Sequence, residues 1–69
     1  MNREKAIDVA TEAARAAGAS LEDYLLPPTC RMVDDEWLVL FQEKTMTVGG
    51  HFMAVVHVRS GDVQLVAGA

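Results

Sequence analysis

The chain is poor in the residues that small domains use as cross-links. It has 69 residues and a single cysteine, Cys30, so no disulfide can form within one chain. One cysteine and two histidines also make a structural metal site unfavourable. Domains of this size bury little surface and commonly depend on such additions or on a partner subunit. Since 51% of the residues are apolar, the sequence indicates oligomerisation or an unusually efficient core.

Basic residues are also scarce. Six oppose ten acidic residues, which gives a net charge of −4. The segment from Glu22 to Glu43 holds six acidic residues against Arg31 alone. Such a surface repels phosphate backbones and anionic lipid, so neither nucleic acid nor a membrane is expected as a partner. A basic protein suits it better, although the same charges also serve to keep an apolar chain in solution.

Long hydrophobic runs are absent. Six charges interrupt residues 1–18, which argues against a signal peptide, and no stretch is long enough to span a membrane. There is no internal repeat or linker. We therefore predict one cytoplasmic domain covering residues 1–69.

Residues 3–17 have the pattern of a helix. Asn2 is placed to cap its first turn, and Gly18 to end it. One face of this helix carries Ile7, Ala10, Ala14 and Ala17. The stretch from Ser20 to Asp23 resembles a capping signal, which predicts a short helical turn before Pro27 and Pro28 force an extended path.

The rest of the chain predicts strands at residues 29–33, 36–43, 51–58 and 63–66. Turns are expected at 34–35 and at 59–62, where Gly61 can supply a positive φ. The connection at 44–50 is expected to hold an extended piece at 45–48 and a bulge or turn at Gly49-Gly50. Short connections make neighbouring strands antiparallel. The predicted fold class is α+β, with the N-terminal helix packed on a three- to four-stranded antiparallel sheet.

The strands are apolar on both faces, whereas a helix can cover only one face of a sheet. The helix is expected over Trp37, Val39 and Phe41 together with Phe52, Ala54 and Val56. The opposite face would then be apolar with a polar rim that includes Gln42 and Gln64, an arrangement typical of a protein interface. The candidate interface residues are Leu38, Leu40, His51, Met53, Val55, His57 and Val66.

No catalytic motif is present, so we predict no catalytic residues and no cofactor. His51 and His57 share a strand face but lie about 20 Å apart at strand rise, too far to hold one metal ion. Cys30 with a histidine has the elements of a nucleophile and its base, yet a lone cysteine on an apolar strand is more often a core residue. We therefore predict no metal site and no enzymatic activity.

Three segments carry a resemblance to known families: EKAIDVATEAARAAG, EWLVLF and GGHFMAVVHVRSGDVQLVAG. Together they resemble PepSY-like and cystatin-like small bacterial domains, and are similar to short immunity proteins of the nuclear-transport-factor-like fold. The chain departs from the usual pattern at the last turn, where His57 and Ser60 replace Asp and Thr. The resemblance implies a cystatin-like two-layer fold with a sheet curled around the helix, and a binding or inhibitory role without catalytic residues.

The predicted function is that of a non-enzymatic protein-binding module, of inhibitory or immunity type, that forms a homodimer or binds a protein partner through the apolar sheet face. Two alternatives remain open. One is a small-ligand-binding or enzymatic module with a pocket between helix and sheet, lined by His51, His57 or Cys30. The other is a structural homodimer with no separate ligand.

Overall fold

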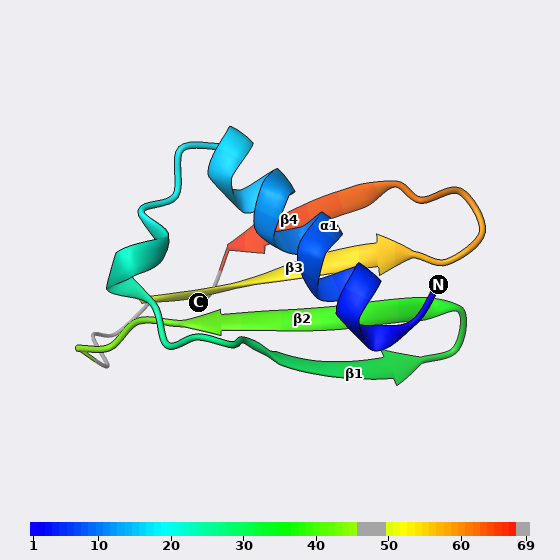
Figure 1. Cartoon of the computed structure of the whole chain (residues 1–69), viewed down its shortest axis with the longest axis horizontal. Helices are drawn as coiled ribbons and strands as arrows, with labels where there is room; N and C mark the ends of the chain where they lie inside the picture. Colours follow the sequence, from blue (N-terminus) through cyan, green and yellow to red (C-terminus); the bar gives the residue numbers. More distant parts are fainter. Residues whose placement is uncertain (46–49, 68–69) are drawn as a thin grey trace.

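One helix lies across one face of a four-stranded antiparallel sheet (Figure 1). The computed structural model describes residues 1–45 and 50–67. The strand order is β1-β2-β3-β4, so each strand pairs with its neighbours in the chain. The elements are α1 (Arg3–Ala16), the 3₁₀ turn η1 (Leu21–Asp23), β1 (Thr29–Val33), β2 (Glu36–Gln42), β3 (His51–His57) and β4 (Val63–Ala67). The predicted α+β class is confirmed, and the sheet has four strands.

Both ends of α1 are set by the residues that the sequence indicated. The side chain of Asn2 accepts a hydrogen bond from the Lys5 backbone N–H at 2.8 Å, which satisfies one of the free donors of the first turn. At the other end Gly18 has a φ of 94°, and the N–H of Ala19 donates to the carbonyl of Ala14 at 3.0 Å. This pairing across a left-handed glycine is the Schellman arrangement, and it turns the chain away from the helix axis.

The helix face that meets the sheet differs in part from the predicted one. Ala6, Ala10 and Ala14 are fully buried. Ile7 is only half-buried, and Ala17 is exposed because the helix ends at Ala16 and Ala17 forms its C-cap. A row of alanines at four-residue spacing lets the helix axis approach the sheet closely, since none of these side chains extends beyond Cβ.

The core lies between α1 and the two central strands. Val39 and Phe41 from β2 and Ala54 and Val56 from β3 are fully buried, as predicted for the face beneath the helix. The register places Val39 opposite Ala54 and Phe41 opposite Phe52. The stacked rings of Phe41 and Phe52, with centroids 4.8 Å apart, provide the bulkiest contact of the core.

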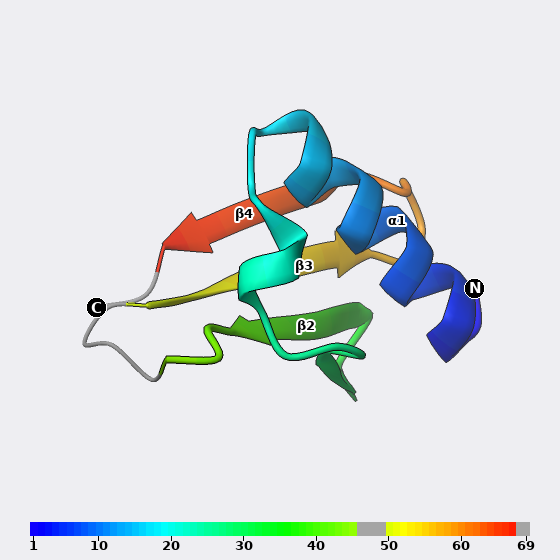
Figure 2. The same cartoon turned by 60° about the vertical axis from the view of Figure 1, so that its left-hand side comes forward.

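The segment between helix and sheet closes one end of this core (Figure 2). Tyr24 bridges to Glu43, and its ring meets Phe52 edge-on at 5.2 Å between centroids. Leu25 donates its backbone N–H to the carbonyl of Gln42 at 2.8 Å. The capping signal at Ser20 gives only the three-residue turn η1, with no side-chain hydrogen bond from Ser20.

The two hairpin turns described by the structure use backbone conformations with positive φ. Asp34 has a φ of 55° and Gly61 a φ of 78°, both in the left-handed region that aspartate tolerates and glycine favours. The predicted strands are confirmed to within a residue at each end. Most of the predicted extended piece at 45–48, and Gly49 of the bulge or turn predicted at Gly49-Gly50, lie outside the described residues. In the described part of the chain, α1 is too short and too polar to cross a bilayer.

Candidate interaction surface

The sheet face opposite the helix, here called the outer face, has an apolar centre. The alternation of each strand sends Leu38 and Leu40 of β2 to this face, where they lie opposite Val55 and Met53 of β3. These four side chains are half-buried by one another and by the flanking strands. Val66 of β4 pairs with Met53 and remains 43% exposed. The five apolar residues predicted for the outer face therefore lie side by side on it.

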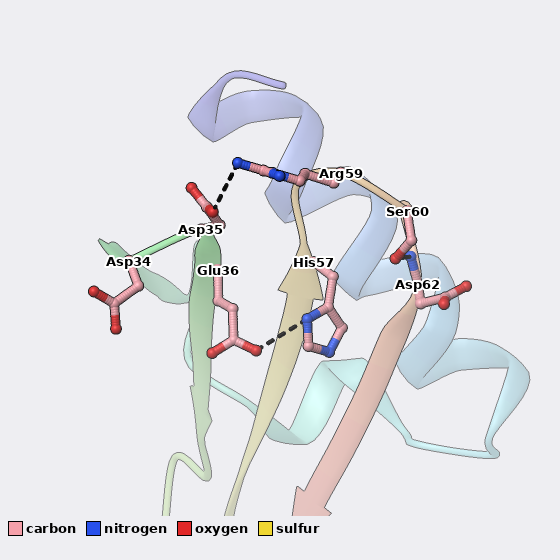
Figure 3. A pocket seen from close by; sticks show the side chains of 7 residues that line it. All are labelled: Asp34, Asp35, Glu36, His57, Arg59, Ser60 and Asp62. Carbon is pink, nitrogen blue, oxygen red and sulfur yellow. Dashed lines mark hydrogen bonds and ion pairs between the residues drawn. The ribbon is translucent and has the colours of Figure 1, made fainter.

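The two histidines of β3 mark opposite ends of the outer face. At one end Nδ1 of His57 lies 2.9 Å from Oε2 of Glu36, and Figure 3 shows the two side chains pointing toward each other. At the other end His51 is exposed and pairs in register with Gln42. The sequence placed both histidines at the rim correctly. It did not indicate the contact with Glu36, because that contact depends on the register between β2 and β3.

The β1 side of the outer face was missed by sequence reasoning. Register places Thr29 beside Leu40, and Arg31 beside Leu38. These residues border a hollow of about 310 Å³, lined by Thr29, Arg31, Leu38, Leu40 and Met53. The alternation of residues 29–33, counted back from the 34–35 turn, would have identified Thr29 and Arg31. The hollow itself depends on how far each side chain extends from the sheet, which a sequence pattern does not give.

The outer face carries little charge. Of the ten acidic side chains only Glu36 lies in a strand, and Arg31 is the only Lys or Arg in a strand. The other carboxylates lie on α1, around η1 and in the turns. The net negative charge is thus displaced from the apolar surface, and a second negatively charged molecule can approach this surface with little repulsion.

One group of carboxylates gathers at the turns beside Glu36 (Figure 3). Asp35 lies 3.5 Å from Arg59, and the Ser60 hydroxyl accepts the backbone N–H of Asp62 at 3.2 Å. The side chains labelled in Figure 3 border an open depression of about 550 Å³. Within residues 1–45 and 50–67, no three acidic, histidine or cysteine side chains are arranged to hold a metal ion.

Cys30 lies on the opposite side of the sheet from both histidines. It pairs with Val39 and packs against the core beneath α1, whereas His51 and His57 belong to the outer face. Burial raises the pKa of the Cys30 thiol, and the positive charge of Arg3 partly offsets this rise. Of the three residues named for a pocket between helix and sheet, only Cys30 therefore lies on the helix side of the sheet.

The fold and this surface define the protein as a small α+β domain with one helix on a four-stranded antiparallel meander, whose second apolar face is covered by no helix or strand of the described residues. No protein-family model, curated protein or solved structure matches the chain. The resemblance to PepSY-like and cystatin-like domains thus extends only to the arrangement of a helix on an antiparallel sheet.

Proposed function

We propose that the protein is a non-enzymatic, cytoplasmic binding module that acts through its outer face, with a second copy of the chain as the principal occupant. The observation that carries this proposal is the contiguous apolar centre formed by the pairs Leu38–Val55 and Leu40–Met53 and by Val66. No helix or strand of residues 1–45 and 50–67 covers it. An apolar patch with a polar rim is the usual anatomy of an interface.

The distribution of charge supports a second copy over a strongly charged occupant. Arg31 and Glu36 are the only Asp, Glu, Lys or Arg residues in the four described strands, so the centres of two outer faces can meet without a cluster of like charges. Apolar side chains from two sheets packed face to face, about 10 Å apart, form a core of the kind found in β-sandwiches.

The test is the molar mass of the purified chain, measured by light scattering after size exclusion over a concentration series. The wild type is expected to approach the dimer mass as its concentration rises. Val55→Glu is expected to stay monomeric, because association would bury an unpaired carboxylate at the centre of the interface. Ser20→Glu, which adds the same charge at an exposed position away from the sheet, is the matched control and should associate like the wild type.

Circular dichroism of each variant separates loss of association from loss of folding. Val55 is only half-buried in a single chain, so Val55→Glu is expected to keep the wild-type spectrum. A wild-type chain that remains monomeric at every concentration, or a Val55→Glu variant that associates normally, would overturn self-association through this face.

A basic protein partner is the second candidate, and the acidic residues outside the strands favour it. Carboxylates lie at both ends of the sheet, around η1 and around the 34–35 turn. This placement suits the inhibitory or immunity-type role that the family resemblance implies. If the gene has a neighbour encoding a basic, toxin-like protein, co-purification of the two chains as a complex that dissociates with salt would support this role. Failure of the two purified chains to associate at low salt would count against it.

A further inference from the structure

The outer face is not symmetrical from one edge to the other, and this asymmetry determines how two copies fit. The hollow of about 310 Å³ lies on the β1–β2 side. On the other side, Val66 of edge strand β4 is the most exposed of the five apolar residues of the outer face. A surface with a depression on one side and a projecting side chain on the other can be complementary to itself.

We propose that two copies pack outer face to outer face about a two-fold axis that runs parallel to the strands, between β2 and β3. This inference rests on the proposed function and specifies its geometry. Such an axis exchanges the β1 side of one copy with the β4 side of the other while keeping each position along the strands. Register places Thr29, Leu40, Met53 and Val66 in one row across the sheet. Val66 of each copy therefore lies over Thr29 of the other, at the hollow.

The neighbouring row provides a polar contact. It consists of Arg31, Leu38, Val55 and Gln64. The same rotation places Gln64 of one copy over Arg31 of the other, and Leu38 over Val55. Among the described residues Arg31 has no ion-pair partner, so its guanidinium has donors to offer. The Gln64 side-chain oxygen is an acceptor of the required kind.

The row at the end of the sheet is compatible with this arrangement. It contains Glu36 and His57, which contact each other within one copy. After the rotation, Glu36 of one copy lies over His57 of the other, so the two carboxylates do not face each other directly. Carboxylate and imidazole alternate across the interface, which avoids the penalty of superposed like charges.

A two-fold axis perpendicular to the strands fits less well. It would place β1 over β1 of the second copy, with Arg31 over Thr29. The two hollows would then overlap and both Val66 side chains would lie together at the opposite edge. That packing leaves space unfilled at the interface, so the side chains that line it lose van der Waals contacts.

The extent of the face agrees with a dimer of moderate affinity. Four strands at ~4.8 Å spacing, with five residues each at ~3.4 Å rise, give a face of roughly 19 Å by 17 Å. Two such faces with side-chain relief bury on the order of 1,000 Å², near the lower limit for specific interfaces. We therefore expect dissociation in the micromolar range.

The test is a charge exchange between Arg31 and Gln64, read as the dimer dissociation constant from sedimentation equilibrium. Gln64→Arg is expected to weaken the dimer by about tenfold or more, because two guanidinium groups then face each other. Arg31→Glu is expected to weaken it less, because the Gln64 side-chain N–H can donate to the new carboxylate. The double variant Arg31→Glu/Gln64→Arg pairs opposite charges across the interface and should return to within about threefold of the wild type. Within one chain the two positions lie on opposite edge strands, so restoration cannot come from an intramolecular pair.

A second measurement uses thiols in a Cys30→Ser background. A mixture of the Thr29→Cys and Val66→Cys variants, treated with a short bis-maleimide, should form a mixed cross-linked dimer far more readily than either variant alone. Cross-linking of Thr29→Cys with itself would indicate the perpendicular axis and overturn the proposal. If the wild type dimerises but the double variant remains as weak as the Gln64→Arg variant, this geometry is overturned and self-association is left intact. A wild type that never dimerises would overturn both.

Discussion

The closeness of α1 to the sheet predicts the effect of enlarging Ala10. Ala10 is the middle of the three fully buried alanines of α1 and packs in the same cluster as Val39 and Ala54. Ala10→Leu adds three carbon atoms where the side chain has no exposed surface. Leucine is nearly as good a helix former as alanine, so the substitution tests packing and not helix propensity.

Overpacking of a filled core costs about 1–3 kcal/mol. A chain of 69 residues has an expected free energy of unfolding of roughly 3–10 kcal/mol, at 0.05–0.15 kcal/mol per residue. Ala10→Leu should therefore remove a substantial fraction of the stability. With a urea m-value of about 1 kcal/mol/M for so small a domain, the unfolding midpoint should fall by about 1–3 M.

Urea unfolding followed by circular dichroism, at one fixed low protein concentration, is the assay. Ala16→Leu is the matched control, because Ala16 is exposed on the same helix and its substitution should change stability by less than about 0.5 kcal/mol. Equal midpoints for wild type and Ala10→Leu would refute the reasoning, since they would mean that the helix leaves room for a leucine over the sheet.

Two further predictions concern a helix cap and a thiol. Asn2→Ala removes the acceptor for the Lys5 N–H and should lower the free energy of unfolding by about 1 kcal/mol in the same urea assay. Ser20→Ala, at a cap position without a side-chain hydrogen bond, should have little effect, and equal losses for both would contradict this account of capping. Because burial raises the pKa of the Cys30 thiol, Cys30 should react with iodoacetamide at neutral pH more slowly than a cysteine in a short peptide. The rate of this reaction should rise in urea, where the thiol becomes exposed. A folded-state rate equal to that of the peptide would show that the thiol is freely accessible.

Much of the architecture could be predicted from sequence because strand alternation is a strong signal here. The stretch from Glu36 to Gln42 alternates bulky inner residues with leucines, and its two faces were assigned correctly from that pattern alone. The turn at Gly61 was predicted because few residues other than glycine adopt its φ of 78° without cost.

The helix face was predicted less well, for a physical reason. The sequence pattern weighted Ile7 as a buried residue because of its hydrophobicity. The structure buries Ala6 completely and leaves Ile7 half-buried, because close approach to the sheet favours a small side chain directly beneath the helix axis.

Contacts that depend on register across a long connection could not be predicted. The pairing of Glu36 with His57 requires β2 and β3 to align in one way, and the connection between them is too long for turn geometry to fix that alignment. The hollow beside Arg31 likewise depends on how side chains from three strands, β1, β2 and β3, are arranged around it.

The strand order of the meander also bears on how the chain folds. Each strand finds its partner across a connection close by in the sequence, so little chain entropy is lost in closing each loop. The helix is different, since its buried alanines need β2 and β3 to be paired before a continuous platform exists for them. We therefore expect α1 to gain its tertiary contacts only after β2 and β3 have paired. Substitutions in the β2–β3 hairpin should consequently affect the folding rate more than those in α1, which should act mainly on the unfolding rate.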